Sequence, residues 1–377
     1  GLIDMHVHLR EPGQEDKETI ETGTAAAAAG GFTAVACMPN TTPALDNESQ
    51  IEFVLRQAER VGHCRVFPIG AITKGRAGKE LAEIGLMARA GVAAFSDDGD
   101  GIADAGTCQR AMRYVAMFDK LFIQHCEDES LSSGGCMNAG EIATRLGLPG
   151  ISALAEEVMV QRDILLAASA GVRYHVAHVS TAGSVEMVRA GKRAGHAVTA
   201  EVCPHHVLLT EERCTTYDTL YKMHPPLRGQ RDVEACVEGV RDGTIDCLVS
   251  DHAPHADQDK QQEFQSAPFG ITGLETSLGL FAGVLVSGGV IGWPRLIEMM
   301  STCPARLLRL ELGTLKRGSP ADVTLIDPDR EWTFEVEQSR SKARNSPFDG
   351  WKMHGKAVLT LVDGRIRFSD AEFPVNL

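Results

Sequence analysis

The chain alternates between short apolar runs and longer segments with a helical pattern, and this alternation limits the possible folds more than any other feature. Glycines such as Gly91 and Gly171 follow the helical segments, at the position where helices usually end. Strands that alternate with helices are typical of a parallel sheet, and eight of them close into a (β/α)8 barrel. The apolar runs are Leu2–Leu9, Phe32–Met38, Arg65–Ile72, Val92–Phe95, Leu121–Gln124, Val172–Val179, Val198–Val202 and Asp246–Ser250.

We therefore predict an α/β fold in which residues 1–310 form a TIM-like (β/α)8 barrel. A doubly wound open sheet is the alternative, but no G-x-G-x-x-G motif follows the first strand. The helices are expected at Ser49–Val61, Lys79–Ala90, Gln109–Phe118, Ala153–Ala170, Ser184–Ala194 and Arg231–Arg241.

The pattern changes to strands after a helical stretch at Pro294–Leu310. We predict that residues 311–377 form a small C-terminal β appendage, an incomplete β-sandwich domain that packs on the barrel. It has few strands for an independent sheet, so it either packs on the barrel or has lost partner strands upstream of Gly1. Gly1 is not a methionine, and the chain is expected to be processed or a fragment. The predicted strands are Ala321–Ile326, Trp332–Val336 and Ala357–Phe368, with a hairpin turn at Asp363-Gly364.

Charge and cysteine usage restrict the compartment and the partners. The chain has 37 Lys and Arg against 51 Asp and Glu, a net charge of −14, and no basic stripe, which argues against nucleic acid as a partner. Its ten cysteines form no C-x-x-C pair, so we expect a reduced, cytoplasmic protein. The uncharged stretch Thr276–Trp293 contains five glycines and is predicted to be a buried helix and a turn, not a membrane span.

Polar side chains lie at the ends of six of the predicted strands, and these ends meet at one mouth of a barrel. With 13 histidines in the chain, the His6-x-His8 pair alone is weak evidence for a metal site. Histidines and carboxylates at the same end of separate strands are much stronger evidence, and they predict a metal centre for Zn²⁺ or a similar ion. The histidines and carboxylates are His6, His8, Asp97, Asp98, His125, His178 and Asp251, and Asn40 is a further polar residue at this end.

Zn²⁺ would lower the pKa of a water molecule to about 7. A carboxylate such as Asp98 can bridge two ions, and Asp251 on the other side of the mouth is then a candidate general base. His175 is expected to point away from the mouth if His178 points into it. His63, His196, His205, His206 and His354 are predicted to be structural.

Several motifs resemble those of the bacterial type I dihydroorotases of the amidohydrolase superfamily, in order and in spacing, from Gly1 to about Gly364. They are Asp4-Met-His-Val-His-Leu-Arg10-Glu-Pro-Gly13, Met38-Pro-Asn40-Thr, Ser96-Asp-Asp-Gly99, His125-Cys-Glu-Asp, His175-Val-Ala-His-Val-Ser-Thr181, Ser250-Asp-His-Ala-Pro-His255 and Pro268-Phe-Gly-Ile-Thr-Gly273.

The resemblance implies a zinc-dependent (β/α)8 barrel enzyme that interconverts N-carbamoyl-L-aspartate and L-dihydroorotate in de novo pyrimidine (UMP) synthesis. It implies two zinc ions per subunit, with Asp98 as the bridge. Asp98 is preferred to Asp97 because its spacing to His125 fits the family. The implied ligands are His6, His8, Asp98 and Asp251 for one ion and Asp98, His125 and His178 for the other.

The substrate carries a carboxylate, and Arg10 shares a strand face with His8, where its guanidinium suits such a group. By resemblance, Asn40 and His255 assist it, and Phe269 and Gly270 offer backbone groups to the ring amide. Two features depart from the family. His224 in His224-Pro-Pro-Leu-Arg228 replaces an asparagine that helps to hold the ring, and about fifty residues that precede the first barrel strand in the family are absent.

Two other functions compete with the dihydroorotase prediction. Allantoinases and hydantoinases are similar in the first strand, but they usually bridge their metals with a carboxylated lysine and lack the arginine at Arg10. Non-catalytic relatives that support aspartate transcarbamoylase typically lose metal ligands, all of which are present here. The expected partners are a small-molecule substrate and, as possibilities, a second copy of the chain and aspartate transcarbamoylase.

Overall fold

The computed structural model describes residues 1–371 and 373. Eight strands lie in two parallel sheets, as the alternation of strands and helices predicts. One sheet has the order β1-β2-β3 and the other the order β10-β9-β8-β5-β4. The strands are β1 (Leu2–Val7), β2 (Phe32–Cys37), β3 (Arg65–Pro68), β4 (Ala94–Phe95), β5 (Leu121–Gln124), β8 (Arg173–Val176), β9 (Val198–Val202) and β10 (Cys247–Leu248).

Backbone hydrogen bonds connect the two sheets at both edges. After β3, the Gly70 amide donates to the Ala94 carbonyl (3.0 Å), and the Ser96 amide donates back to Gly70 (3.0 Å). At the other edge, the His8 amide donates to the His252 carbonyl (2.9 Å). Strand β3 therefore neighbours β4, and β1 neighbours the segment that follows β10.

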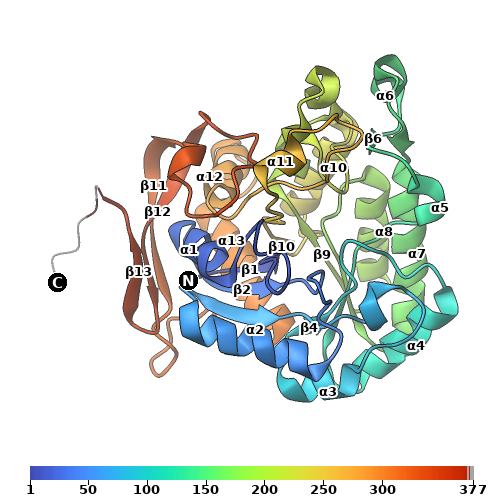
Figure 1. Ribbon diagram of the computed structural model, residues 1–377, viewed down its shortest axis with the longest axis horizontal. Coiled ribbons are helices and arrows are strands. Elements are labelled where there is room, and N and C mark those ends of the chain that lie inside the picture. The colour runs from blue at the N-terminus through green and yellow to red at the C-terminus, as the bar shows by residue number, and fades with distance from the viewer. Residues whose placement is uncertain (372, 374–377) are drawn as a thin grey trace.

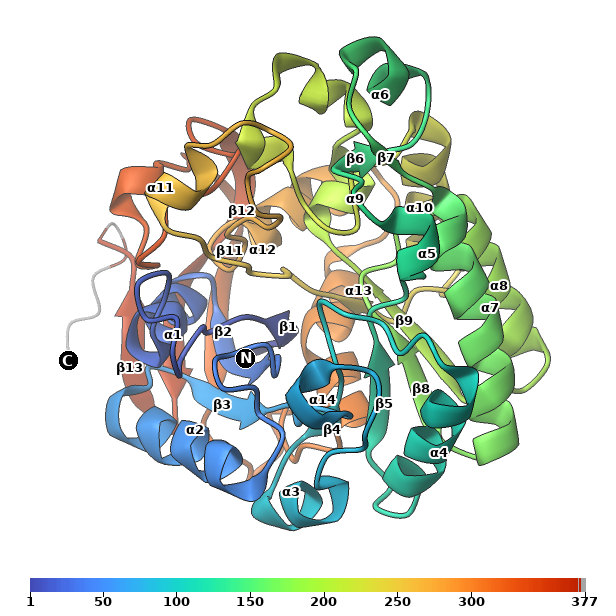
Figure 2. The same ribbon diagram turned by 45° about the vertical axis from the view of Figure 1, so that its right-hand side comes forward.

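Helices cover the outer face of the sheets, and Figure 2 shows α4, α7 and α8 outside β5, β8 and β9. Several helices begin at residues whose side chains accept a backbone amide, such as Thr19, Asn47 and Asp104. The strands are almost wholly buried, which explains their continuous apolar runs. The larger helices are α1 (Ile20–Ala29), α2 (Glu48–Val61), α3 (Ile84–Ala90), α4 (Ala105–Ala116), α7 (Ala153–Ala170), α8 (Ala182–Arg193) and α10 (Gln230–Arg241).

Shorter elements lie in the connections on the side where the strands end. They are α5 (Glu129–Ser132), β6 (Met137–Asn138), α6 (Glu141–Leu146), β7 (Gly150–Ile151), α9 (Pro204–Leu208) and α11 (Asp257–Lys260). After them come α12 (Ser277–Phe281), α13 (Trp293–Ile297) and α14 (Cys303–Leu308).

The predicted boundaries are wrong in places. The strands predicted at Leu2–Leu9 and Val172–Val179 end earlier, at Val7 and Val176. The helix predicted at Lys79–Ala90 begins only at Ile84.

The stretch Thr276–Trp293 is a buried helix, α12, that continues as a π-helix and ends in a turn. Among the described residues, none of the helices combines the length and the apolar character needed to cross a bilayer.

The C-terminal strands form a separate antiparallel sheet in the order β11-β12-β13, which lies beside α1 (Figure 1). They are β11 (Val323–Thr333), β12 (Lys352–Val362) and β13 (Arg365–Ser369).

The hairpin prediction agrees with the structure, since both Asp363 (φ 52°) and Gly364 (φ 73°) have positive φ. The two strands predicted at Ala321–Ile326 and Trp332–Val336 are in fact one strand, β11, with an irregular middle. The Thr360 hydroxyl donates to the Ala28 carbonyl (2.8 Å) and ties this sheet to α1.

Candidate metal and substrate site

The six predicted ligand side chains meet where the strands end, and each is at most 7% exposed. His6 Nε2 lies 3.3 Å from Asp98 Oδ1, and His8 Nε2 lies 3.1 Å from Asp251 Oδ1. On the other side of Asp98, His178 Nε2 lies 3.5 Å from Oδ1 and 2.9 Å from His125 Nδ1. The structure thus brings together two groups of potential ligands that share His6: His6, His8 and Asp251, and His6, Asp98 and His178.

The donor atoms of this cluster fit a cation. His6 Nε2 and Asp98 Oδ1 are buried and have no hydrogen-bond partner among the described residues. Zn²⁺ binds nitrogen and oxygen at about 2.0–2.2 Å, which places neighbouring ligand atoms of a tetrahedron roughly 3.4 Å apart. The spacings around Asp98 and Asp251 are close to this value, and the mixture of imidazoles and carboxylates suits a borderline divalent ion.

Second hydrogen bonds fix the orientation of two of the imidazoles. His6 Nδ1 donates to Glu201 Oε1 (2.5 Å), and His8 Nδ1 donates to the amide oxygen of Asn40 (2.8 Å). Because Nδ1 donates in each ring, Nε2 is the atom that carries the lone pair in the neutral imidazole, and it faces the carboxylates. Such outer partners are usual around metal-binding histidines. Asn40, predicted to help bind the substrate, therefore also orients a predicted metal ligand.

Glu201 and His175 correct the sequence analysis. His175 does not point away from the site: its Nε2 lies 3.1 Å from Glu201 Oε2, and the other oxygen of Glu201 binds His6. Burial alone would raise the pKa of Glu201, but the two histidines lower it to about 2. The one signal for Glu201 in the sequence is an acidic residue within the apolar run Val198–Val202.

The structure separates the two adjacent aspartates. Asp97 Oδ1 accepts the backbone amides of Ile72 (2.7 Å) and Thr73 (3.0 Å), so its carboxylate holds the chain that follows β3. Burial raises the pKa of Asp97 to about 6. Asp98 is the residue that faces the histidines.

Burial and charge act against each other in this cluster. Burial alone would lower the pKa of His6, but Asp98, Glu201 and Asp251 outweigh it and raise that pKa well above its ordinary value. Burial would raise the pKa of Asp251, yet His6 and His8 keep it below its ordinary value. His125 is different: burial, with His178 and His224 nearby, lowers its pKa to about 3.

Three site residues have a backbone conformation that non-glycine residues rarely adopt. Arg10, His178 and Asp251 have φ of 61°, 30° and 48°. Such positions cost of order 1–3 kcal/mol each and persist only where the surrounding structure imposes them. Each lies just after a strand, where the turn directs its side chain to the site.

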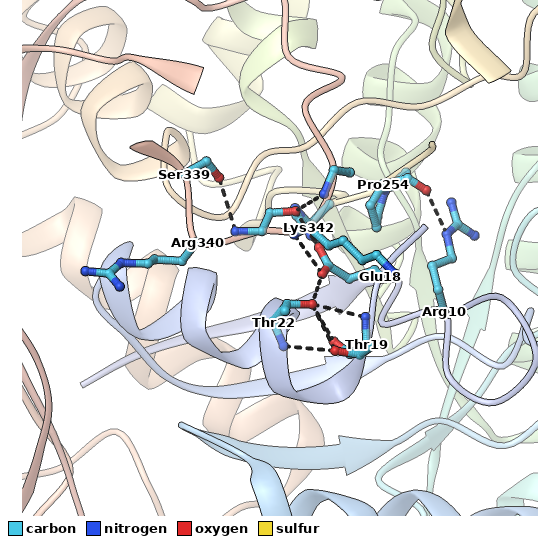
Figure 3. Close-up of polar contacts among 12 residues, drawn as sticks. Arg10, Glu18, Thr19, Thr22, Pro254, Ser339, Arg340 and Lys342 are labelled. Atoms are coloured by element: carbon cyan, nitrogen blue, oxygen red, sulfur yellow. Dashed lines mark hydrogen bonds and ion pairs between the residues drawn. The ribbon is translucent and has the colours of Figure 1, made fainter. Parts of the chain in front are cut away.

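The predicted substrate residues surround the cluster. Arg10 is 7% exposed, and its Nε donates to the Pro254 carbonyl (3.1 Å; Figure 3). His255 Nε2 donates to the Phe269 carbonyl (2.6 Å), and the Gly270 amide donates to the backbone carbonyl of Lys222 (3.0 Å). The Phe269 carbonyl and the Gly270 amide, expected to serve the substrate ring, are thus already engaged, although a carbonyl can accept a second bond.

His224 lies next to the cluster of predicted metal ligands. Its ring stacks on Phe269, with 4.6 Å between centroids, and lies 4.8 Å from the ring of His125. His224 Nε2 is 2.5 Å from Glu127 Oε2, a partner that the sequence analysis missed. Asp100, His125, Glu127, His224 and Phe269 line a cavity of about 290 Å³ at this place.

Cys203, His205 and His206 form another buried group of potential ligands, just after β9. His206 Nε2 donates to the Pro225 carbonyl (3.0 Å), which holds the segment that bears His224. The structural roles predicted for the two histidines stay predictions.

Comparison with known proteins supports the motif resemblance. Residues 1–184 match the family described as Dihydro-orotase-like. The chain is 50% identical to a dihydroorotase of Caldanaerobacter subterraneus (98% of this chain, 85% of the relative) and 52% identical to one of Pelotomaculum thermopropionicum (98% and 86%). The solved structure of an L-hydantoinase (dihydropyrimidinase) from Arthrobacter aurescens is similar, with a TM-score of 0.88 and 27% identity over 100% of this chain and 86% of that one. The chain belongs to the dihydroorotase family.

Proposed function

We propose that this chain is a zinc-dependent dihydroorotase of the bacterial type I class, which reversibly opens the ring of L-dihydroorotate to N-carbamoyl-L-aspartate. The convergence of His6, His8, Asp98, His125, His178 and Asp251 on one buried place carries this proposal. Relatives that are about 50% identical over nearly the whole chain support the choice of substrate.

We propose two zinc ions as the cofactor. His6, His8, Asp98 and Asp251 would hold one ion, and Asp98, His125 and His178 the other. Bound zinc acts as a Lewis acid on a carbonyl and makes water a nucleophile near neutral pH. An aspartate at the bridging position and the arginine at Arg10 favour dihydroorotate over a hydantoin or allantoin as the substrate.

The chain's own residues bind the substrate and move the proton. Asp251 is the candidate base that takes a proton from the attacking water and gives it to the ring nitrogen when the amide C–N bond breaks. Arg10, with Asn40 and His255 beside it, is the candidate site for the substrate carboxylate. His224, Phe269 and Gly270 would line the ring.

We also infer that the eight parallel strands form a closed (β/α)8 barrel over residues 1–310, with residues 311–377 as the appendage. The backbone bonds from Gly70 to Ala94 and from His8 to His252 support closure at both sheet edges. The homodimer, the aspartate transcarbamoylase partner and the cytoplasmic location stay predictions.

The first prediction concerns the orientation of His6. Glu201→Gln replaces the charged acceptor of His6 Nδ1 and should lower zinc affinity about 10- to 100-fold, the usual effect of losing such a partner. Competition with a chromophoric chelator measures it. Asp163→Asn is the matched control, since Asp163 is equally buried but pairs with Arg162. Equal zinc affinities for the Glu201→Gln variant and the parent would contradict this role.

The second prediction concerns proton transfer. Asp251→Asn should keep the fold and most of the zinc but lose at least about 100-fold in kcat, the usual contribution of a positioned acid–base group. Steady-state kinetics of dihydroorotate hydrolysis and elemental analysis measure both quantities. A variant that turns over within a factor of three of the parent would show that Asp251 is not the base.

The third prediction concerns His224. His224 Nε2 donates its proton to Glu127, so only Nδ1, as an acceptor, remains for the ring of the substrate. An asparagine side chain offers two donor hydrogens and an acceptor oxygen. His224→Asn should therefore raise kcat/KM for dihydroorotate by roughly 5- to 100-fold, as expected for a restored buried hydrogen bond. The substrate assignment would be overturned if the variant had a lower kcat/KM for dihydroorotate and the parent had a higher kcat/KM for a hydantoin than for dihydroorotate.

A further inference from the structure

A segment from the C-terminal part of the chain crosses to the loops of the site. We call residues 339–346, which lie between β11 and β12, the 339–346 arm. Figure 3 shows Lys342 of this arm beside Glu18, and Ser339 and Arg340 farther from Glu18. The Arg340 amide donates to Glu275 Oε2 (3.0 Å), and the Lys342 amide donates to Glu18 Oε1 (3.1 Å). A buried carboxylate, Glu18, and a partly buried one, Glu275, thus anchor the beginning of the arm.

Asn345 lies near the end of the arm, and its side chain is fully engaged. Its Nδ2 donates to the carbonyls of Ala253 (3.1 Å) and Gly270 (3.1 Å). Its Oδ1 accepts the backbone amide of His255 (3.1 Å), and its own carbonyl accepts the amide of Thr272 (3.0 Å). The residue is 2% exposed, so water cannot replace these bonds.

These partners belong to the two segments that carry the proposed substrate residues. Ala253 and His255 follow Asp251, and Gly270 follows Phe269, whose carbonyl accepts from His255 Nε2. Asn345 therefore fixes the backbone of both segments, while the His255 ring joins them a second time. Only an amide of this length supplies two donors and one acceptor in this arrangement, because an aspartate would place an oxygen against two carbonyls.

We propose that Asn345 is a positioning residue that determines substrate affinity by holding His255 and the segment at Gly270 in register. The inference rests on the proposed substrate roles of these two residues. Asn345 is not one of the proposed substrate residues, and it acts through its partners. Asp251 is held separately by His8, so the effect falls on KM rather than on kcat.

The test is a double-mutant cycle of Asn345→Ala and His255→Ala, with kinetics in both directions of the reaction. Asn345→Ala should raise KM at least tenfold, with kcat within a factor of three and an unchanged zinc content. If Asn345 acts through His255, the double variant should have a KM no higher than the worse single variant. If Asn345→Ala does not fold, Asn345→Ser, which keeps one hydroxyl donor and acceptor, takes its place in the cycle.

Thr360→Val is the matched control. It removes a buried hydrogen bond between β12 and α1, away from the site, and should leave KM unchanged. If His255→Ala raises KM, either of two results would overturn the inference. One is an Asn345 variant with the parent's KM, and the other is a double variant in which the two effects on KM multiply. If His255→Ala leaves KM unchanged, that result would instead overturn the proposed role of His255, and this inference with it.

Discussion

Three buried carboxylates, Asp98, Glu201 and Asp251, share a small volume with the rings of His6, His8 and His178, and the rest of the structure depends on balancing their charges. An unpaired charge in such a place costs several kcal/mol. Protons on the imidazoles would balance the cluster in part, which is why the pKa of His6 is raised. Cations at the unpartnered nitrogens and oxygens would balance it more fully.

Distant parts of the chain hold this cluster in place. Left-handed backbone at Arg10, His178 and Asp251 directs side chains into the site. Glu201 and Asn40 set the protonated nitrogen of two imidazoles. The segment between β11 and β12 holds the neighbouring loops around His255 and Gly270 instead. Different hydrogen bonds therefore hold the histidine–carboxylate cluster and most of the predicted substrate side. The two sides share Asn40 and the loop after β10.

The sequence predicts the parts of this arrangement that depend on local pattern. Burial on both faces makes the parallel strands visible as apolar runs, and the ends of these runs locate the six predicted ligands. The sequence does not show whether Asp97 or Asp98 faces the histidines, because adjacent aspartates differ only in the residues that the fold places opposite each of them. Glu201 and Glu127 were missed because an acidic residue near a strand has no spacing that marks it as a partner of a histidine. His175 was misplaced because the chain leaves the sheet after Val176, so strict alternation does not extend to His178. Asn345 lies 90 residues from its partner His255, beyond any local signal.

The central claim is that the buried cluster is a zinc centre for ring opening of dihydroorotate. Elemental analysis of the protein purified without chelator, followed by the dihydroorotate assay before chelation, after it and after zinc is restored, tests this claim most directly. We predict one to two equivalents of zinc, loss of activity on chelation and its return with zinc. Protein that contains no metal and hydrolyses dihydroorotate equally well after chelation would contradict the claim.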